Sequence, residues 1–409
     1  MCMPRCAFLT LCRCFSAALL AAACLFGAFC SAQTTANKAT PEDPTAAVLR
    51  AFDTHDLVLL GEMHGNKQLY EWLRALVADP AFANRVDDIV VEFGNSLYQL
   101  SVDRYVSGEN VPMEQVQKAW RNMVGAIGPP SPVYESLYQA VRETNMSHRG
   151  KHQMRIVCGD PYIDWDKVKS TEDIGPFLAH RDEWYAEVVQ EEVLAKHHRA
   201  LLIMGSGHFL RRNGAGYIEQ HLREAGFNTY LIIAGTNTID AGEVERRFDA
   251  VKAPAIISTT ASWVGELPAQ PVTSGGGPVP MRVAAGALQG PQSAQGGAAR
   301  TAGSSLGPAP VPAVKLRDAA DALLYLGPAD SLTEIYMGRE ELDGTAYGKE
   351  LIRRFDIMFG HPINFIPDQT EVPQFSHPRM TGGASGVLMG LPPMPKSAHD
   401  PLPPRPPSE

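Results

Sequence analysis

Short apolar runs alternate with longer amphipathic stretches through much of the chain, and this alternation constrains the fold most strongly. Buried parallel strands read as continuous apolar runs, and the connection between two of them is long enough to hold a helix. The sequence therefore predicts an α/β fold over residues 46–266, with a mostly parallel central sheet flanked by helices. The apolar runs cover residues 57–60, 88–91, 154–158, 200–204 and 229–234.

Two stretches between these runs carry helical patterns. Apolar residues stand at positions 69, 72, 73, 76 and 77, which is the spacing of a helix with one buried face. Residues 112–149 are longer than a single crossover helix and hold two helical patterns separated by Gly128-Pro129-Pro130. We expect this stretch to form a helical insertion placed to cap the sheet.

Residues 1–32 have the pattern of a secretory signal peptide. They carry only two charges, an apolar run follows these, and the small residues Ser31 and Ala32 suit cleavage. This pattern predicts export to the periplasm or the extracellular space, with residues 33–45 as a polar tether. In an alternative interpretation, the sequence AAAC ending at Cys24 resembles a bacterial lipoprotein processing site, and a lipid on Cys24 would then anchor the exported chain to a membrane.

The second half of the chain contains two stretches of biased composition. Residues 267–313 have no acidic or aromatic side chain and bury too little apolar area to offset the entropy lost on folding, so we expect a disordered insertion. Residues 314–368 contain an apolar run at 322–326 and a helical pattern, which predict a strand and a helix of the same domain. Residues 369–409 are rich in proline, and we expect a disordered tail without packed structure.

Charge and missing motifs exclude several functions. The formal net charge of −9 argues against a nucleic-acid partner and leaves a small-molecule ligand or substrate as the expected partner. The motifs GxxxxGK[ST], HExxH and CxxCH do not occur. One GxSxG lies at residues 303–307, inside the predicted insertion, without the strand and helix that a nucleophilic serine needs.

Polar side chains follow the apolar runs at the point where each run ends. Glu62 and His64 follow the first run, Glu92 ends the second, and His208 follows the fourth. Because the carboxyl ends of parallel strands meet at one edge of a sheet, we expect these residues to lie together. Glu62 and His64 are two positions apart, so on an extended segment both side chains point the same way. Such a set can bind a divalent ion such as zinc, transfer protons, or line a haem pocket.

Three of the polar residues near these positions also have simpler interpretations. A carboxylate such as Glu62 stabilises the start of a following helix through its charge. Asp160 stands before a proline, which is typical of a turn. Tyr98, a few residues past Glu92, is more typical of packing than of an iron ligand.

Four motifs together resemble a known family. GEMHG follows the first run, EFG the second, GDP the third and GSGHF the fourth. They look like the motifs of the ChaN-like haem-binding uptake proteins, which form one superfamily with the Tiki/TraB proteases and the erythromycin esterases. The resemblance covers roughly residues 46–240 and implies an α/β domain whose pocket is formed by Glu62, His64, Glu92 and His208.

The resemblance implies two functions, and the sequence leaves both open. ChaN-like members are exported and bind haem between protomers through tyrosine and histidine, which implies haem as cofactor and a homodimer. The candidate haem-binding residues here are His64, His208 and Tyr98, and no position matches the haem tyrosine of the family. Tiki members are metal-dependent peptidases, which implies a metal-dependent esterase or peptidase whose ion or attacking water is held by Glu62, His64, Glu92 and His208. We predict haem or iron-compound binding and uptake, with the hydrolase as the alternative.

Overall fold

The computed structural model describes the part of the chain that carries the predicted sheet. The predicted signal peptide, the candidate lipid anchor and residues 270–313 lie outside the described residues, so what was expected of them stays a prediction. The described residues are 39–125, 130–148, 152–211, 217–234, 246–248, 251–260, 262–267, 269, 314–360, 370–373 and 395–404.

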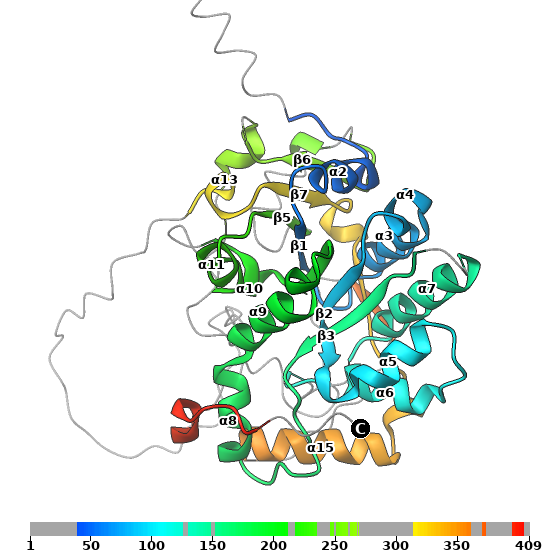
Figure 1. The fold of residues 1–409 in the computed structure, drawn as a ribbon, viewed down its shortest axis with the longest axis vertical. Coiled ribbons are helices and arrows are strands. Elements are labelled where there is room, and N and C mark those ends of the chain that lie inside the picture. Colours follow the sequence, from blue (N-terminus) through cyan, green and yellow to red (C-terminus); the bar gives the residue numbers. More distant parts are fainter. Residues whose placement is uncertain are drawn as a thin grey trace, which may run out of the picture.

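A mixed sheet forms the centre of the described structure (Figure 1). Seven of the described strands pair in the order β3-β2-β4-β1-β5-β7-β6, and all neighbours are parallel except β6 and β7. The predicted α/β fold is therefore confirmed, and each of the six apolar runs forms a strand. The strands are β1 (Leu57–Glu62), β2 (Asp88–Asn95), β3 (Arg155–Asp160), β4 (Ala200–Gly205), β5 (Thr229–Ala234), β6 (Ala255–Ser258) and β7 (Ala322–Tyr325).

Helices cover both faces of this sheet, because successive side chains of a strand point to opposite sides. Val58 and Leu60 of β1 lie in one buried core, whereas Leu57 and Leu59 lie in the other. The first core is covered by α2 (Pro44–Ala51), α3 (Lys67–Ala78), α4 (Pro80–Ala83), α5 (Gln99–Val106), α6 (Met113–Arg121) and α7 (Val133–Ser147). The second is covered by α9 (Arg181–Glu192), α10 (Ser206–Phe209), α11 (Tyr217–Glu224) and α13 (Leu316–Ala319).

The predicted helical insertion forms α6 and α7, which pack on the sheet beside β2. Tyr138 of α7 donates a hydrogen bond to the backbone oxygen of Phe93 at 3.0 Å, and its ring lies 4.7 Å from that of Trp120 in α6. Gly128 and Pro129, which were expected to separate the two helices, lie outside the described residues.

The described end of the predicted tether is part of the fold. Glu42 exchanges two backbone hydrogen bonds with Ile256 of β6, and Asp43 caps the N-terminus of α2 by accepting from the Ala46 N–H at 2.8 Å. Residues 39–45 are therefore fixed at the antiparallel edge of the sheet, which corrects the expectation of an unstructured tether there. This contact could not be predicted from the side-chain pattern, because main-chain groups make it.

The two ends of the predicted insertion lie side by side. Ala269 donates a backbone hydrogen bond to Val314 at 2.7 Å, and Leu316 donates to Leu267 at 2.8 Å. Leu267 and Ala269 are buried, so the packed structure extends slightly past the predicted boundary at residue 267. After this point β7 pairs with β5, so the chain returns to the same sheet.

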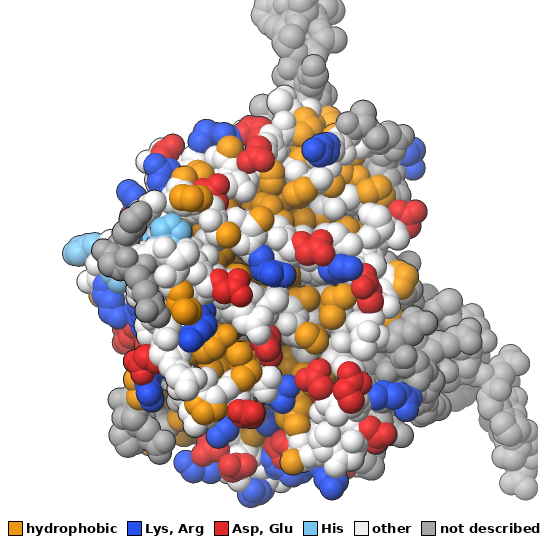
Figure 2. All heavy atoms as spheres, turned by 90° about the vertical axis from the view of Figure 1, so that its right-hand side faces the viewer, with side chains coloured by type: hydrophobic (Ala, Val, Ile, Leu, Met, Phe, Trp, Pro, Cys, Tyr) orange, Lys and Arg blue, Asp and Glu red, His pale blue; other side chains and the backbone are white. Residues whose placement is uncertain are grey.

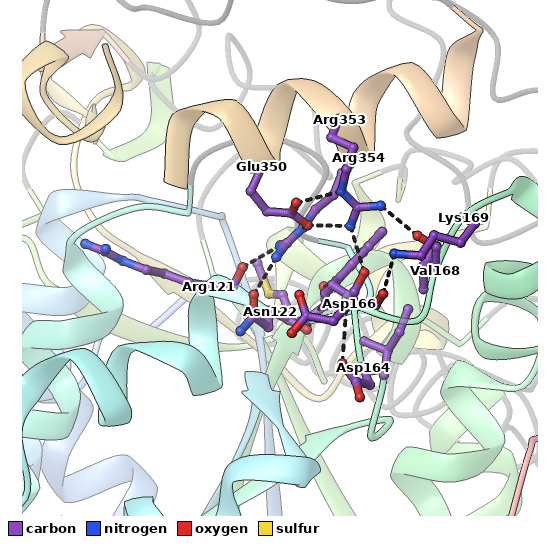
Figure 3. A network of polar contacts seen from close by, with 12 residues as sticks. Arg121, Asn122, Asp164, Asp166, Val168, Lys169, Glu350, Arg353 and Arg354 are labelled. Carbon is purple, nitrogen blue, oxygen red and sulfur yellow. Dashed lines mark hydrogen bonds and ion pairs between the residues drawn. The ribbon is translucent and has the colours of Figure 1, made fainter. Parts of the chain in front are cut away.

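The chain beyond β7 covers the loop that follows β3. Its elements include η4 (Ala329–Ser331), β8 (Thr333–Ile335), α14 (Arg339–Leu342) and α15 (Ala346–Phe359). Arg353 of α15 donates to the backbone oxygens of Trp165 and Val168 at 2.7 and 2.6 Å, and Arg354 donates to that of Arg121 at 2.7 Å (Figure 3). These contacts join α15 to the end of α6 and to the loop after β3.

Two described parts of the predicted tail are packed, which corrects the expectation of a tail without packed structure. β9 (Glu371–Pro373) pairs with β8, and η5 (Lys396–His399) contacts α8 (Thr171–Ala179). Ala398 is 8% exposed. Proline-rich composition does not prevent such packing, because an extended proline segment can dock on an aromatic surface without forming a helix or sheet of its own.

The surface mixes charges of both signs. On the face seen from the right-hand side of Figure 1, acidic and basic side chains are interspersed among apolar areas (Figure 2). Among the described residues, no helix has the length and apolar character needed to cross a membrane.

Candidate functional site

The ends of β1, β2 and β4 bring the predicted acidic and imidazole residues to one edge of the sheet. Glu62 ends β1, where it pairs in register with Gly205 at the end of β4. Glu92 lies in β2, which pairs with β4 on its other side. Both side chains are buried, at 2% and 6% exposure, so two carboxylates converge on the same end of β4.

His64 is bound to Glu62, as the spacing predicts. Its Nδ1 lies 3.0 Å from Glu62 Oε1, and Tyr70 of α3 donates to Glu62 Oε2 at 2.5 Å. The hydroxyl of Tyr134 in α7 lies 3.4 Å from the same Nδ1. The His64 side chain is 57% exposed, so a molecule from solvent can reach the ring.

Gly205 permits the close approach of the opposite edge of the His64 ring. A Cβ at position 205 would lie 2.8 Å from His64 Nε2 and 3.5 Å from Glu92 Oε2. A side chain at this position would therefore collide with the ring, and glycine leaves the space free. The Nε2 edge of His64 lies against the end of β4, on the side of Glu92.

Glu92 and Asp160 share one arginine. Arg181, the first residue of α9, donates through Nη1 to Glu92 Oε1 at 2.9 Å and through Nε to Asp160 Oδ1 at 2.5 Å. The Gly205 N–H donates to Glu92 Oε2 at 2.7 Å, and the Val124 N–H donates to Asp160 Oδ2. Arg181 thus neutralises buried carboxylates from two neighbouring strands.

These contacts shift the pKa values of the site in different directions. Desolvation lowers the pKa of His64, but the carboxylates of Glu92 and Glu62 outweigh it and raise the pKa to about 9. Burial alone would raise the pKa of Glu92, whereas Arg181 and His64 lower it to about 2. Burial raises the pKa of Asp160 to about 6 even though Arg181 opposes it. At neutral pH the site therefore holds a protonated His64 beside an ionised Glu92.

His208 and Tyr98 are engaged by other residues. His208 Nδ1 lies 2.6 Å from Asp182 Oδ1 in α9. Tyr98, in η1 (Ser96–Tyr98), accepts a hydrogen bond from the Asn122 side chain at 3.2 Å, so its hydroxyl is directed to the end of α6. In the described parts of the chain, Glu62, His64 and Glu92 form a group whose potential ligand atoms all lie within 4.8 Å of one another. His208 and Tyr98 do not belong to this group.

Three residues of the site were not predicted from the sequence. Tyr70 and Tyr134 lie on apolar helix faces, where a tyrosine reads as packing, and Tyr134 does stack on Phe93 with ring centroids 4.1 Å apart. Arg181 begins a helix far along the chain, and no pattern links it to β2. The available signal was indirect: a buried carboxylate such as Glu92 needs a cationic partner.

Glu62, His64 and Glu92 offer the donor types of a zinc site, but their contacts fit proton transfer better. All four carboxylate oxygens already accept hydrogen bonds, from His64 and Tyr70 on Glu62, and from Gly205 and Arg181 on Glu92. The Arg181 guanidinium also lies 2.9 Å from Glu92, where its charge would repel a bound cation. We therefore assign no reaction step to a metal.

Comparisons with known proteins add a partial likeness of fold. No family model and no curated protein matches the chain. Among solved structures, a Bacillus cereus protein shares 12% identity at a TM-score of 0.39, covering 70% of this chain and 94% of that one. ChaN of Campylobacter jejuni, a structure that shows cofacial haem binding, shares 14% identity at a TM-score of 0.30, covering 48% and 86%. The type III effector HopBA1 shares 15% identity at a TM-score of 0.32, covering 49% and 88%. At these values any functional conclusion rests on the residues of the site.

Proposed function

We propose that this chain is a hydrolase of ester or peptide bonds in which His64, oriented by Glu62, is the general base. The observation that carries this proposal is the buried Glu62 carboxylate, which accepts hydrogen bonds from His64 at 3.0 Å and from Tyr70 at 2.5 Å. A carboxylate on Nδ1 fixes the tautomer of the neutral ring, so the lone pair is presented at Nε2.

The proposed reaction starts from the neutral His64 ring, which is populated as the pH approaches 9, with proton transfer from water. Nε2 of His64 takes the proton while the water oxygen attacks the carbonyl carbon of the substrate. The imidazolium that forms is stabilised by Glu62 and Glu92, the two carboxylates that raise the pKa of His64. The proton on Nε2 then passes to the leaving alkoxide or amine, and the product acid is released.

Tyr134 contacts the Nδ1 edge of His64, on the side of Glu62. Its hydroxyl lies 3.4 Å from His64 Nδ1, beside the ring that activates the water. Burial and the nearby Glu62 hold its pKa well above the ordinary value, so the hydroxyl stays protonated at neutral pH. The phenol can accept a hydrogen bond from Nδ1–H beside Glu62 and so help to hold the ring in place.

Haem or iron-compound binding is the function that the resemblance to ChaN-like proteins implies, and it stays a prediction. It is favoured by the exposed ring of His64, which a ligand can reach from solvent. His208 holds Asp182 through Nδ1, which is compatible with a ligand at Nε2, whereas the Tyr98 hydroxyl faces Asn122 at the end of α6. The hydrolase uses contacts that already surround His64, so we place it first. Export and a homodimer also stay predictions.

One preparation of the full chain tests both functions. We expect His64→Ala to lower kcat/KM for an aryl ester or a peptide by about 100-fold or more, the usual range for loss of a general base. His55→Ala serves as the matched control, because its ring contacts Thr54 and Tyr230 and should leave turnover unchanged.

Haemin titration of the same variants distinguishes the alternative. A Soret shift that His64→Ala weakens, in a protein that turns over neither substrate class between pH 6 and 9.5, would replace the hydrolase by a haem-binding protein. Turnover that His64→Ala leaves intact would also refute the proposed role of His64.

A further inference from the structure

Residues 395–404, which we name the C-terminal strap, lie along α8 at the lower edge of the molecule (Figure 1). The backbone is in the polyproline II region on both sides of η5, with φ and ψ of −62° and 158° at Pro395 and −81° and 148° at Asp400. Three of the four residues after Asp400 are prolines, whose rings restrict φ to the same region. The strap is therefore an extended proline-rich ligand interrupted by one short helical turn.

The surface beneath the strap is aromatic. The rings of Phe177 and Trp184 stand edge-on to that of Tyr162, with centroids 5.9 and 4.9 Å away. Leu402 packs against the cluster that contains Tyr162 and Phe177. Aromatic grooves of this kind bind extended proline-rich segments, because a pre-formed polyproline II segment loses little entropy on binding.

Gly175 of α8 allows the strap to approach the helix closely. A Cβ at this position would lie 2.5 Å from Ser397 Oγ and 2.6 Å from Pro395 Cγ. Glycine inside a helix is less stabilising than alanine, because it loses more backbone freedom on folding. The glycine thus gives up helix stability and leaves room for the strap.

The strap also bonds to the two segments that carry the Arg181 ion pairs. Tyr162, two residues after Asp160, donates from its hydroxyl to the backbone oxygen of Pro403. His180, directly before Arg181, lies with Nε2 3.1 Å from the backbone oxygen of Asp400. The strap therefore spans the end of β3 and the start of α9, which meet in the ion pair of Asp160 with Arg181.

The geometry points to an aromatic docking surface for a proline-rich peptide, formed by α8, Tyr162 and Trp184 and occupied in cis by the C-terminal strap, which holds Arg181 and Asp160 in position. This role goes beyond the proposed hydrolysis and does not depend on it. Tyr162 and His180 are positioning residues, because they act on the site through Asp160 and Arg181.

The test uses the full chain and a labelled peptide with the strap sequence PKSAHDPLPP. Leu402→Asp places a charge against the aromatic cluster and should release the strap. We expect the peptide to bind this variant saturably in fluorescence anisotropy, and to bind the wild type at least about 10-fold more weakly, because the tethered strap has a high effective concentration. A peptide that carries the same Leu-to-Asp change should not bind.

Hydrogen exchange supplies a second measurement that needs no substrate. In Leu402→Asp we expect faster amide exchange over residues 176–186 than in the wild type, whereas exchange in β1 and β4 should be unchanged. Equal peptide binding by the two proteins, or unchanged exchange over residues 176–186, would overturn the inference. Because neither measurement depends on turnover, failure of the hydrolase proposal would leave this result interpretable.

Discussion

Replacing Arg181 with methionine removes the only charge that joins Glu92 and Asp160 among their described hydrogen bonds and ion pairs. Arg181 lies 2.9 Å from Glu92 Oε1 and 2.5 Å from Asp160 Oδ1, and these carboxylates are 6% and 1% exposed. Removing one partner of a buried ion pair leaves an uncompensated charge and typically costs about 3 to 5 kcal/mol. We expect Arg181→Met to lower the free energy of unfolding by that amount at pH 8.

The pKa shift of Glu92 gives the size of a related contribution, which Arg181 shares with His64, His208 and the Gly205 N–H. The pKa of Glu92 is lowered from 4.5 to about 2, so its ionisation stabilises the fold fully above pH 4.5, and this contribution is lost as the pH falls through 2. The difference corresponds to about 3 kcal/mol. Without Arg181, the pKa of Glu92 should lie above its value of about 2 and that of Asp160 above its value of about 6, so both carboxylates take up protons at a higher pH than in the wild type. The destabilisation should therefore shrink toward pH 5.

Urea unfolding followed by circular dichroism, at pH 8 and pH 5, measures both effects. Arg104→Met is the matched control, because Arg104 lies 2.7 Å from Glu109 but both side chains are about half exposed. Such a surface pair contributes about 1 kcal/mol or less. A loss at pH 8 no larger than that of the control, or a loss that grows toward pH 5, would refute the electrostatic reasoning.

Four further outcomes follow from the site. In the wild type, kcat/KM should rise with pH and level off above about pH 9, because the neutral form of His64 is the base, and Glu62→Gln should move this rise to lower pH. Tyr70→Phe should cost about 1.5 to 3 kcal/mol of unfolding free energy, the value of a hydrogen bond to a charged group, as measured by urea unfolding. Gly205→Ala should displace the His64 ring and lower kcat/KM at least about 10-fold, with unfolding free energy changed by less than about 1 kcal/mol, because φ at this residue is −51° and suits alanine. Chelation with EDTA should leave turnover unchanged, and a loss that zinc restores would show that Glu92 and His64 bind a metal after all.

The strands of the central sheet were predictable because parallel strands are buried on both faces. The run at 57–60 became β1 with every residue buried, the run at 200–204 became its neighbour β4, and the run at 88–91 became β2 on the far side of β4. β6 was missed since only four residues, Ala255–Ser258, form it, and its partners lie far along the chain. The prediction of disorder from composition was wrong for the strap, because this segment has no apolar periodicity but packs on aromatic rings.

The pairing of Glu62 with His64 was predictable for a local reason. Residues two apart at the end of a strand stay close whatever the rest of the fold does, and the structure has them 3.0 Å apart. The approach of Glu92 followed from strand order in a parallel sheet. His208 does not belong to the ligand group, and its contact with Asp182 at 2.6 Å could not be predicted because the two residues come from different helices.

The protonation state of the site could not be predicted from the sequence, because it depends on charges that only the fold brings together. Glu62 and His64 by themselves suggest a pair that shares a proton near neutral pH. Once Arg181 lowers the pKa of Glu92, that carboxylate remains ionised and helps to hold the proton on His64 up to about pH 9. The pKa of His64, the proposed base, thus also depends on an arginine 117 positions away, which keeps Glu92 ionised and directly lowers the pKa of the ring through its own charge. A change at Arg181 should therefore alter the pH dependence of turnover at His64 although the two side chains lie on opposite sides of Glu92.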